Sequence, residues 1–284
     1  MTIKNLSMIM KNLSNKINDL LQYELDPAFK RRAGIILNNL NLAPGDQVLE
    51  VGCGRGFYLG AILKLVKGVM VVGLDNNEKY LKMARTISGG KAKVIKGNAV
   101  YLPFAKGTFD KVICSEVLEH VREDWKVASE IYRVLKPGGK ALISVPNKNY
   151  PYWLDPLNYS LEKLLKVHIP KNIWWLAGIW ADHVRLYTEE ELVNKLKKGG
   201  FKNFKIWRAT RFGVWGEHFL LYGIGKNLVE MGLFPEFDRF GKRSKKSLLL
   251  TFVLKFIYLE DKRNDEEQTN QDSEYVNIMV EAKK

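Results

Sequence analysis

A glycine-rich turn placed directly after an apolar segment constrains this chain more than any other feature of its sequence. Residues 48–51 read Val-Leu-Glu-Val, which suits a buried strand, and Gly52, Gly54 and Gly56 follow at alternating positions. An amphipathic segment over residues 57–66 comes next. The pattern predicts a strand, a tight turn and a helix, in which the bare glycine backbone can lie close to a ligand.

An acidic residue follows at the spacing that a nucleotide site requires. Asp75 ends a second apolar segment, and it lies nineteen residues after Gly56. A carboxylate at the tip of the neighbouring strand accepts hydrogen bonds from both hydroxyls of a ribose. The dinucleotide fingerprint G-x-G-x-x-G would need glycine in place of Phe57, so this turn is of another kind. A glycine turn that binds nothing is the weaker interpretation, because Glu50 and Asp75 accompany the glycines.

The chain continues as alternating strand and helix patterns with short connections. Further strands are expected at residues 92–96, 111–114, 140–145 and 201–207, with helices at residues 76–88, where Asn76 can act as the cap, and before Pro137-Gly138-Gly139. Such alternation predicts a parallel sheet covered on both faces, with ligands beyond the carboxyl ends of its strands. The glycine turn, Asp75, Asn98 and Ser115 all lie at such ends.

Residues 45–147 resemble the type 11 group of class I S-adenosylmethionine (SAM) dependent methyltransferases, which includes enzymes of quinone biosynthesis. The resemblance rests on Glu50-x-Gly52-x-Gly54-x-Gly56, Asn98-Ala99, Leu102-Pro103-Phe104, Phe109-Asp110, Glu116-Val117-Leu118-Glu119-His120 and Leu135-Lys136-Pro137-Gly138-Gly139. It implies an α/β fold: a Rossmann-like seven-stranded sheet with helices on both faces, helical insertions and a last strand antiparallel to its neighbours. The family usually has an acid where Asn98 stands, although an amide can also pair with the adenine edge.

The same resemblance implies S-adenosyl-L-methionine as the cofactor and a role for each site residue. The glycine backbone would lie against the methionine part, Glu50 near its ammonium group and Asp75 on the ribose. Asn98 and Ala99 would flank the adenine, and Ser115 would lie beside the sulfonium. The predicted cofactor residues are Glu50, Gly52, Cys53, Gly54, Gly56, Asp75, Asn76, Asn98, Ala99 and Ser115.

Two of the four histidines are candidates for catalysis. His120 follows the fourth expected strand, and His183 opens the phrase His-Val-Arg-Leu-Tyr-Thr, which also resembles the family near its substrate mouth. Either imidazole could act as a general base or orient the acceptor, and a hydrogen-bonded surface histidine is the alternative for each. No metal-ligand spacing is visible, which disfavours a metal-dependent O-methyltransferase. Cys53 and Cys114 are expected to be buried and reduced, as in a reducing compartment.

The chain divides into four predicted regions. Residues 1–45 form an N-terminal helical region, residues 46–207 the SAM-binding core, residues 208–274 an apolar and basic insertion, and residues 275–284 the final strand. Within the core, residues 148–182 are rich in aromatic side chains and are either a substrate cover or an extra hydrophobic layer. The first helix is expected to pack at the domain edge, with a lid or a membrane-surface helix as alternatives.

The formal charge of +14 calls for an anionic partner or surface. The leading function is methyl transfer to a small-molecule or lipid-like acceptor. One alternative is a tRNA or rRNA methyltransferase. Amino-methylating enzymes of that class have Asn or Asp before Pro-Pro after the fourth strand, and this chain has Ser115-Glu116-Val117 there, which disfavours them. The other alternative is a SAM-binding protein without catalysis.

Residues 239–259 combine basic and apolar residues, which indicates a peripheral membrane contact or packing on the core. The expected location is cytoplasmic, because neither a signal peptide nor a bilayer-spanning apolar run is visible.

Overall fold

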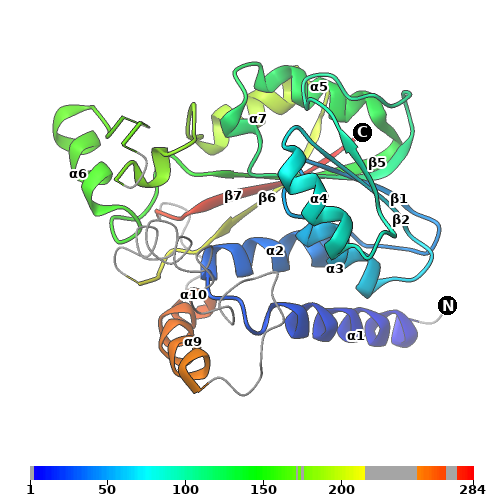
Figure 1. The fold of residues 1–284 in the computed structure, drawn as a ribbon, viewed down its shortest axis with the longest axis horizontal. Coiled ribbons are helices and arrows are strands. Elements are labelled where there is room, and N and C mark those ends of the chain that lie inside the picture. Colours follow the sequence, from blue (N-terminus) through cyan, green and yellow to red (C-terminus); the bar gives the residue numbers. More distant parts are fainter. Residues whose placement is uncertain (1–2, 171, 174–175, 215–247, 267–273) are drawn as a thin grey trace.

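The sheet has the expected Rossmann-like architecture with an antiparallel last strand. The computed structural model describes residues 3–170, 172–173, 176–214, 248–266 and 274–284 (Figure 1). Within these residues seven strands form one sheet in the order β3-β2-β1-β4-β5-β7-β6. The strands are β1 Gln47–Val51, β2 Met70–Asp75, β3 Lys93–Lys96, β4 Phe109–Ser115, β5 Leu135–Pro146, β6 Asn203–Ala209 and β7 Asn277–Lys283. Strands β1 to β5 pair in parallel, and β7 runs antiparallel to β5 and β6.

Helices cover both faces of this sheet. They are α1 Ile3–Leu21, α2 Pro27–Asn39, α3 Phe57–Leu65, α4 Glu78–Ile87, α5 Asp124–Val134, α6 Pro156–Leu165, α7 Glu189–Lys198, α9 Leu248–Asp261 and α10 Arg263–Glu266, with short 3-10 turns η1 Leu118–His120 and η2 Gly178–Trp180. Figure 1 shows α5 and α7 on one side of the sheet and α1, α2 and α3 on the other. The parallel strands are therefore buried on both faces, as their nearly continuous apolar sequences require.

Two apolar cores hold the layers together. On one face Val127 and Ile131 of α5 and Leu192 of α7 are fully buried against the strands. On the other face Ile17 of α1 joins Ile62 of α3 in a second core. Burying each side chain of this size contributes about 1.5–3 kcal/mol. The described part of α1 thus packs at the edge of the core, as its helical spacing predicts.

Three boundaries differ from those expected from the sequence, each for a local reason. The sequence predicts a short helix over residues 33–40, but α2 begins earlier, at Pro27, because the Asp26 carboxylate accepts the Phe29 amide at 2.8 Å and caps it. Helix α4 is capped by Asn77 and not by its neighbour Asn76. Helix α5 ends at Val134, and strand β5 begins at Leu135 and passes through the Pro-Gly-Gly sequence, where its pairing with β4 shifts register.

The described part of the aromatic-rich residues 148–182 forms a layer that follows the end of β5. Tyr150, Leu154 and Ile179 are buried in one apolar cluster, with Trp153 and Trp180 packed against it. The side chain of Asp155 holds this layer together. It caps α6 through the Asn158 amide at 3.2 Å and accepts the Ile179 amide at 3.0 Å.

The second insertion is described in part. Its residues 208–214 and 248–266 include α9, which packs on α2 through Leu254 and Ile257 together with Leu25. The basic residues expected at 239–246 and the histidine at position 218 lie outside the described residues. Among the helices that are described, none is both long and apolar enough to cross a bilayer.

Candidate cofactor and acceptor site

The glycine turn lies at the carboxyl end of β1 and is fixed by backbone hydrogen bonds. The Gly52 and Cys53 amides both donate to the Leu74 carbonyl oxygen of β2, at 2.7 and 3.0 Å. The Gly56 amide donates to the Cys53 oxygen at 2.8 Å, which closes the turn and starts α3. This closure places the turn at the edge of the sheet where the strands of a parallel fold end and ligands bind.

The three glycines of the turn serve different purposes. A Cβ atom on Gly52 would lie 2.4 Å from Cγ2 of Val117, and one on Gly56 would lie 2.7 Å from the Cα of Ala84. A Cβ atom on Gly54 would have nothing within 4 Å, although the backbone there is left-handed with φ of +49°. Gly52 and Gly56 are thus needed for packing, and Gly54 faces open space.

Asp75 at the end of β2 organises the turn. One carboxylate oxygen accepts the Gly54 amide at 2.8 Å, and the other accepts the Asn77 amide at 2.8 Å. Each carboxylate oxygen has two lone pairs, so both can still accept a hydroxyl proton. The predicted ribose contact therefore has the capacity that it needs. Asn76 lies beside it with an exposed side chain.

Glu50 is the second acid of the site and the more unusual one. Its side chain is 4% exposed, the Leu59 amide donates to it, and its Oε2 atom has no hydrogen-bond partner in the described structure. Burial raises the pKa of this carboxyl well above its ordinary value, and the Asp75 charge raises it further. A cation bound beside Oε2 would restore the charged form.

The remaining predicted cofactor residues surround the same edge of the sheet. The exposed Asn98 accepts the Val100 amide at 3.1 Å, and Ala99 packs half-buried against the core. Cys53 and Cys114 are both buried, and burial raises the pKa of both thiols, so neither is prepared as a nucleophile. The buried position of both cysteines agrees with the prediction from sequence.

Ser115 at the end of β4 belongs to a polar network. Its Oγ atom lies 2.8 Å from Oγ of Ser144, which donates to Glu116 at 2.9 Å. Glu116 also pairs with Arg32 of α2 at 3.1 Å and has a left-handed backbone with φ of +55°. Tyr58 lies 3.5 Å from the Ser115 hydroxyl, and burial raises its pKa to about 12. The network joins α2 to the strand ends of the site.

The structure brings His120 and His183 together with an acid that was not singled out from the sequence. The imidazole centroids lie 4.8 Å apart, and the Nε2 atoms lie 3.8 and 4.0 Å from one carboxylate oxygen of Glu119. Glu119 is fully buried. Burial, and then the Glu116 charge, raise the pKa of its carboxyl well above the ordinary value.

These three side chains also place potential metal ligands close together, with one ligand atom from each residue within 4.8 Å of the other two. The sequence shows Glu119 next to His120, and His183 lies far along the chain. The Val184 amide donates to the backbone carbonyl oxygen of Glu119 at 2.8 Å, and this bond brings His183 beside Glu119.

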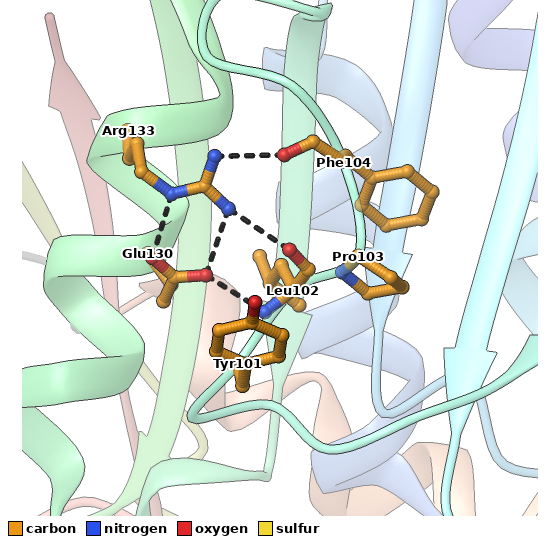
Figure 2. A pocket seen from close by; sticks show the side chains of 6 residues that line it. All are labelled: Tyr101, Leu102, Pro103, Phe104, Glu130 and Arg133. Atoms are coloured by element: carbon orange, nitrogen blue, oxygen red, sulfur yellow. Dashed lines mark hydrogen bonds and ion pairs between the residues drawn. The ribbon is translucent and has the colours of Figure 1, made fainter.

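A pocket beside the loop formed by Leu102, Pro103 and Phe104 has a structural role. Tyr101, Leu102, Pro103, Phe104, Glu130 and Arg133 line it (Figure 2). The Arg133 guanidinium donates to the carbonyl oxygens of Leu102 and Phe104 at 2.9 and 2.7 Å and pairs with Glu130 at 2.7 Å. The predicted cofactor residues do not line this pocket, and Arg133 with Glu130 ties the Leu-Pro-Phe loop to α5.

Together, the parallel sheet, the glycine turn and the acid after β2 define a Rossmann-like enzyme that binds a nucleoside cofactor beyond its strand ends. The family profile described as "Methyltransferase domain" matches residues 49–143. A ubiquinone biosynthesis O-methyltransferase of Aliivibrio fischeri (strain MJ11) is 30% identical over 205 residues, which cover 69% of this chain and 80% of that protein. The chain belongs to the type 11 group of class I SAM-dependent methyltransferases.

Other similarities extend the same result. A sterol 24-C-methyltransferase of Pneumocystis carinii is 38% identical over 117 residues, which cover 39% of this chain and 31% of that protein. A possible histamine N-methyltransferase from Thermotoga maritima superposes with a TM-score of 0.53 at 16% identity, covering 96% of this chain and 95% of that one. A Haemonchus contortus phosphoethanolamine N-methyltransferase 2 in complex with SAM gives a TM-score of 0.54 at 21% identity, covering 90% and 52%. The structural likenesses show the fold.

The residues present fit SAM. The unpartnered Oε2 atom of buried Glu50 suits the methionine ammonium, the open space above Gly54 suits a ligand close to the backbone, and Asp75 keeps lone pairs for ribose hydroxyls. The chain is therefore an S-adenosyl-L-methionine dependent enzyme.

Proposed function

We propose that this methyltransferase acts on a small-molecule or lipid-like acceptor that approaches between the end of β4 and the aromatic layer of residues 148–182. The observation that supports this most is the convergence of the glycine turn, Asp75, Ser115 and the His120–His183 pair at one edge of the sheet. Bound SAM supplies an activated methyl group. The chain must then align the acceptor atom with it and exclude water.

The residues divide this work between the donor and the acceptor. Glu50 binds the ammonium group, Asp75 the ribose, and Asn98 with Ala99 the adenine, while the backbone of the glycine turn holds the methionine part. His120 and His183 lie beyond β4, where an acceptor hydroxyl or acidic carbon would lose its proton. The Nδ1 atom of His120 lies 2.8 Å from the Asp182 carbonyl oxygen, which can only accept. Nδ1 therefore carries a proton, which leaves the Nε2 lone pair free to accept a proton from the acceptor or to bind a cation.

The acceptor class is inferred from the relatives and from the aromatic layer. The relatives include proteins named for ubiquinone and sterol methylation. In this chain Tyr152 and Leu157 of the layer are 47% exposed, and Leu164 is 81% exposed. An apolar surface of this kind suits a hydrophobic ring or chain better than a sugar phosphate.

A turnover assay tests this proposal. The purified chain would be incubated with SAM and a panel of phenols, prenylated phenols, sterols, small amines and bulk tRNA, and S-adenosylhomocysteine would be measured. Turnover with a phenolic or lipid-like acceptor, lost in His183→Ala while SAM affinity is kept, is the expected result. Turnover with tRNA alone, or unchanged turnover in the variant, would refute it.

RNA methylation remains the second candidate because of the charge of +14. RNA binding by counterion release would weaken steeply as salt is raised from 50 to 200 mM. A fluorescence-anisotropy titration of labelled tRNA over that range separates the candidates. Salt-independent or absent binding supports the small-molecule acceptor, and salt-sensitive binding with tRNA turnover supports RNA.

We also propose that residues 239–259 contact a membrane surface peripherally. Phe252, Phe256 and Leu259 lie along one side of α9 and are 74%, 56% and 62% exposed, and Lys255 is exposed beside them. Apolar and basic side chains on one helix favour anionic lipid. Flotation with phosphatidylglycerol vesicles should recover the protein, and the Phe252→Ser/Phe256→Ser double variant should stay in solution. Equal recovery of the unsubstituted protein and the double variant would show that this side of α9 does not bind the vesicles.

A further inference from the structure

We propose that Glu119, His120 and His183 bind one divalent transition-metal ion on the acceptor side of the SAM site. One ligand atom from each residue lies within 4.8 Å of the other two, in the part of the chain that the structure describes. The ion would be held by η1 and by the turn before α7, which a backbone hydrogen bond from Val184 to Glu119 already joins.

The distances within the cluster suit ligands of a shared ion better than hydrogen-bond partners. Nε2 of His120 and of His183 lie 3.8 and 4.0 Å from Oε1 of Glu119, beyond hydrogen-bond length. Two ligands at about 2.1 Å from one tetrahedral ion are about 3.4 Å apart. The ligand atoms lie within 4.8 Å of one another, so side-chain shifts that shorten their separations by up to about 1.4 Å would complete the coordination.

The polar groups of the cluster are arranged for such an ion. Both carboxylate oxygens of Glu119 are buried without a hydrogen-bond partner among the described residues. A buried carboxylate without a partner is unfavourable unless a cation or proton neutralises it. The Nδ1 proton of His120 is directed at the Asp182 carbonyl, at 2.8 Å, so its Nε2 lone pair faces Glu119. This carbonyl–histidine arrangement is the usual support of a metal-bound imidazole.

The ligand set selects the kind of ion. Two imidazoles and one carboxylate favour zinc or a similar transition metal, whereas calcium and magnesium prefer oxygen ligands. Three protein ligands also leave a coordination position open for another oxygen. Val117, two residues before Glu119, lies against Gly52 of the glycine turn, which puts the cluster near the predicted donor site. On the proposed function, the open position would take the acceptor hydroxyl and lower its pKa, and His120 and His183 would serve as metal ligands in place of a general base.

Calorimetry with the metal alone tests this inference without any methyl transfer. ZnCl2 and MnCl2 would be titrated into the chelator-treated full chain in a non-coordinating buffer at pH 7.5. We expect one site, with affinity lowered at least about a hundredfold in Glu119→Gln and in His183→Gln, because each loses one of three ligands. His168→Gln is the matched control, because His168 stacks on Trp180 outside the cluster and should bind the metal as the unsubstituted chain does.

The outcomes separate this inference from the proposed function. A SAM titration on the same samples reports donor binding independently, and His120→Gln serves as a second ligand variant if Glu119→Gln fails to fold. Equal metal affinity in all variants would show binding elsewhere and overturn the inference. Absence of metal binding with SAM affinity intact would also overturn the inference, because a proton shared between Glu119 and the imidazoles would then neutralise the cluster. The methyltransferase assignment would still stand.

Discussion

At the scale of single residues, substitution of Gly54 tests ligand binding separately from core packing, because no other described residue packs against this position. A Cβ atom there meets nothing within 4 Å, whereas one on Gly56 meets the backbone of α4. Gly54→Ala should cost about 1–2 kcal/mol of stability through its left-handed backbone and should weaken SAM binding at least about tenfold. Calorimetric titration with SAM and thermal unfolding measure the two effects.

The control for this substitution is Gly107→Ala. Gly107 also has a left-handed backbone, with φ of +70°, and open space around it, but it precedes β4 at the opposite edge of the sheet. It should lose similar stability and keep full SAM affinity. If Gly54→Ala bound SAM as tightly as Gly107→Ala does, the open space above the turn would not be the cofactor position.

A second residue-scale prediction concerns Glu50 and pH. Burial raises its pKa in the folded chain, so the unfolded chain releases this proton first and stability falls as pH rises above about 4.3. Glu50→Gln should therefore stabilise the SAM-free protein, and more at pH 8 than at pH 5. Urea unfolding at both pH values measures the difference.

Saturating SAM should reverse the benefit of Glu50→Gln, because the ammonium group pairs with the carboxylate and not with the amide. The variant would then bind SAM more weakly at pH 8. A pH-independent effect of Glu50→Gln, with unchanged SAM affinity, would mean that Glu50 is a structural residue of the turn and not part of the donor site.

At the scale of elements, Asp155 supports the aromatic layer. It caps α6 and accepts amide protons from Asn158 and Ile179, and its side chain is 7% exposed. Asp155→Ala should leave these buried donors unsatisfied, at about 1–3 kcal/mol each, and loosen α6 relative to the core. We expect faster amide exchange in residues 148–182, lower turnover and unchanged SAM affinity.

Thr188→Ala provides the comparison for Asp155→Ala. Thr188 caps α7 in a capping box with Glu191, outside the aromatic layer. Its loss should cost about 1 kcal/mol and leave exchange in residues 148–182 unchanged. Normal turnover in Asp155→Ala, with the layer loosened, would show that the layer is packing alone and does not contact the acceptor.

Elements with local signals can be predicted from the sequence, whereas those that depend on distant contacts cannot. The glycine turn and Asp75 are short patterns with fixed geometry, so the sequence alone predicts them. Asn76 and Asn77 have identical side chains, so the backbone conformation alone determines which of them caps α4. The sequence does not predict the cluster of Glu119, His120 and His183, because only the tertiary fold brings His183 close to the other two.

At the scale of the whole molecule, the chain end completes the sheet. Strand β7 lies between β5 and β6, with Ile278, Met279 and Val280 fully buried. The Lys284 ammonium donates to carbonyl oxygens at the end of α5, including that of Leu135 at 2.8 Å. Deleting residues 275–284 should therefore abolish cooperative unfolding, since β6 loses its described pairing partner.

A fluorescence-monitored urea titration checks this prediction, with a Lys284→Ala variant as the mild control. That variant keeps β7 and should lose about 1–2 kcal/mol with the hydrogen bonds to α5. A truncated chain that still unfolded cooperatively and bound SAM would show that the donor half of the sheet is an independent folding unit.

The late position of β7 also sets the order of events during synthesis. The predicted donor-site residues, from Glu50 to Ser115, lie on β1, β2, β4 and the turns after β1, β2 and β3, all of which are made before β6. Strand β6 is left without its partner until β7 has been made, because its described contacts within the sheet are to β7. Until then the edge of β5 that β7 will cover is also unpaired and can pair with other chains. We therefore expect chaperone binding to the nascent chain to be greatest between the synthesis of β5 and that of β7.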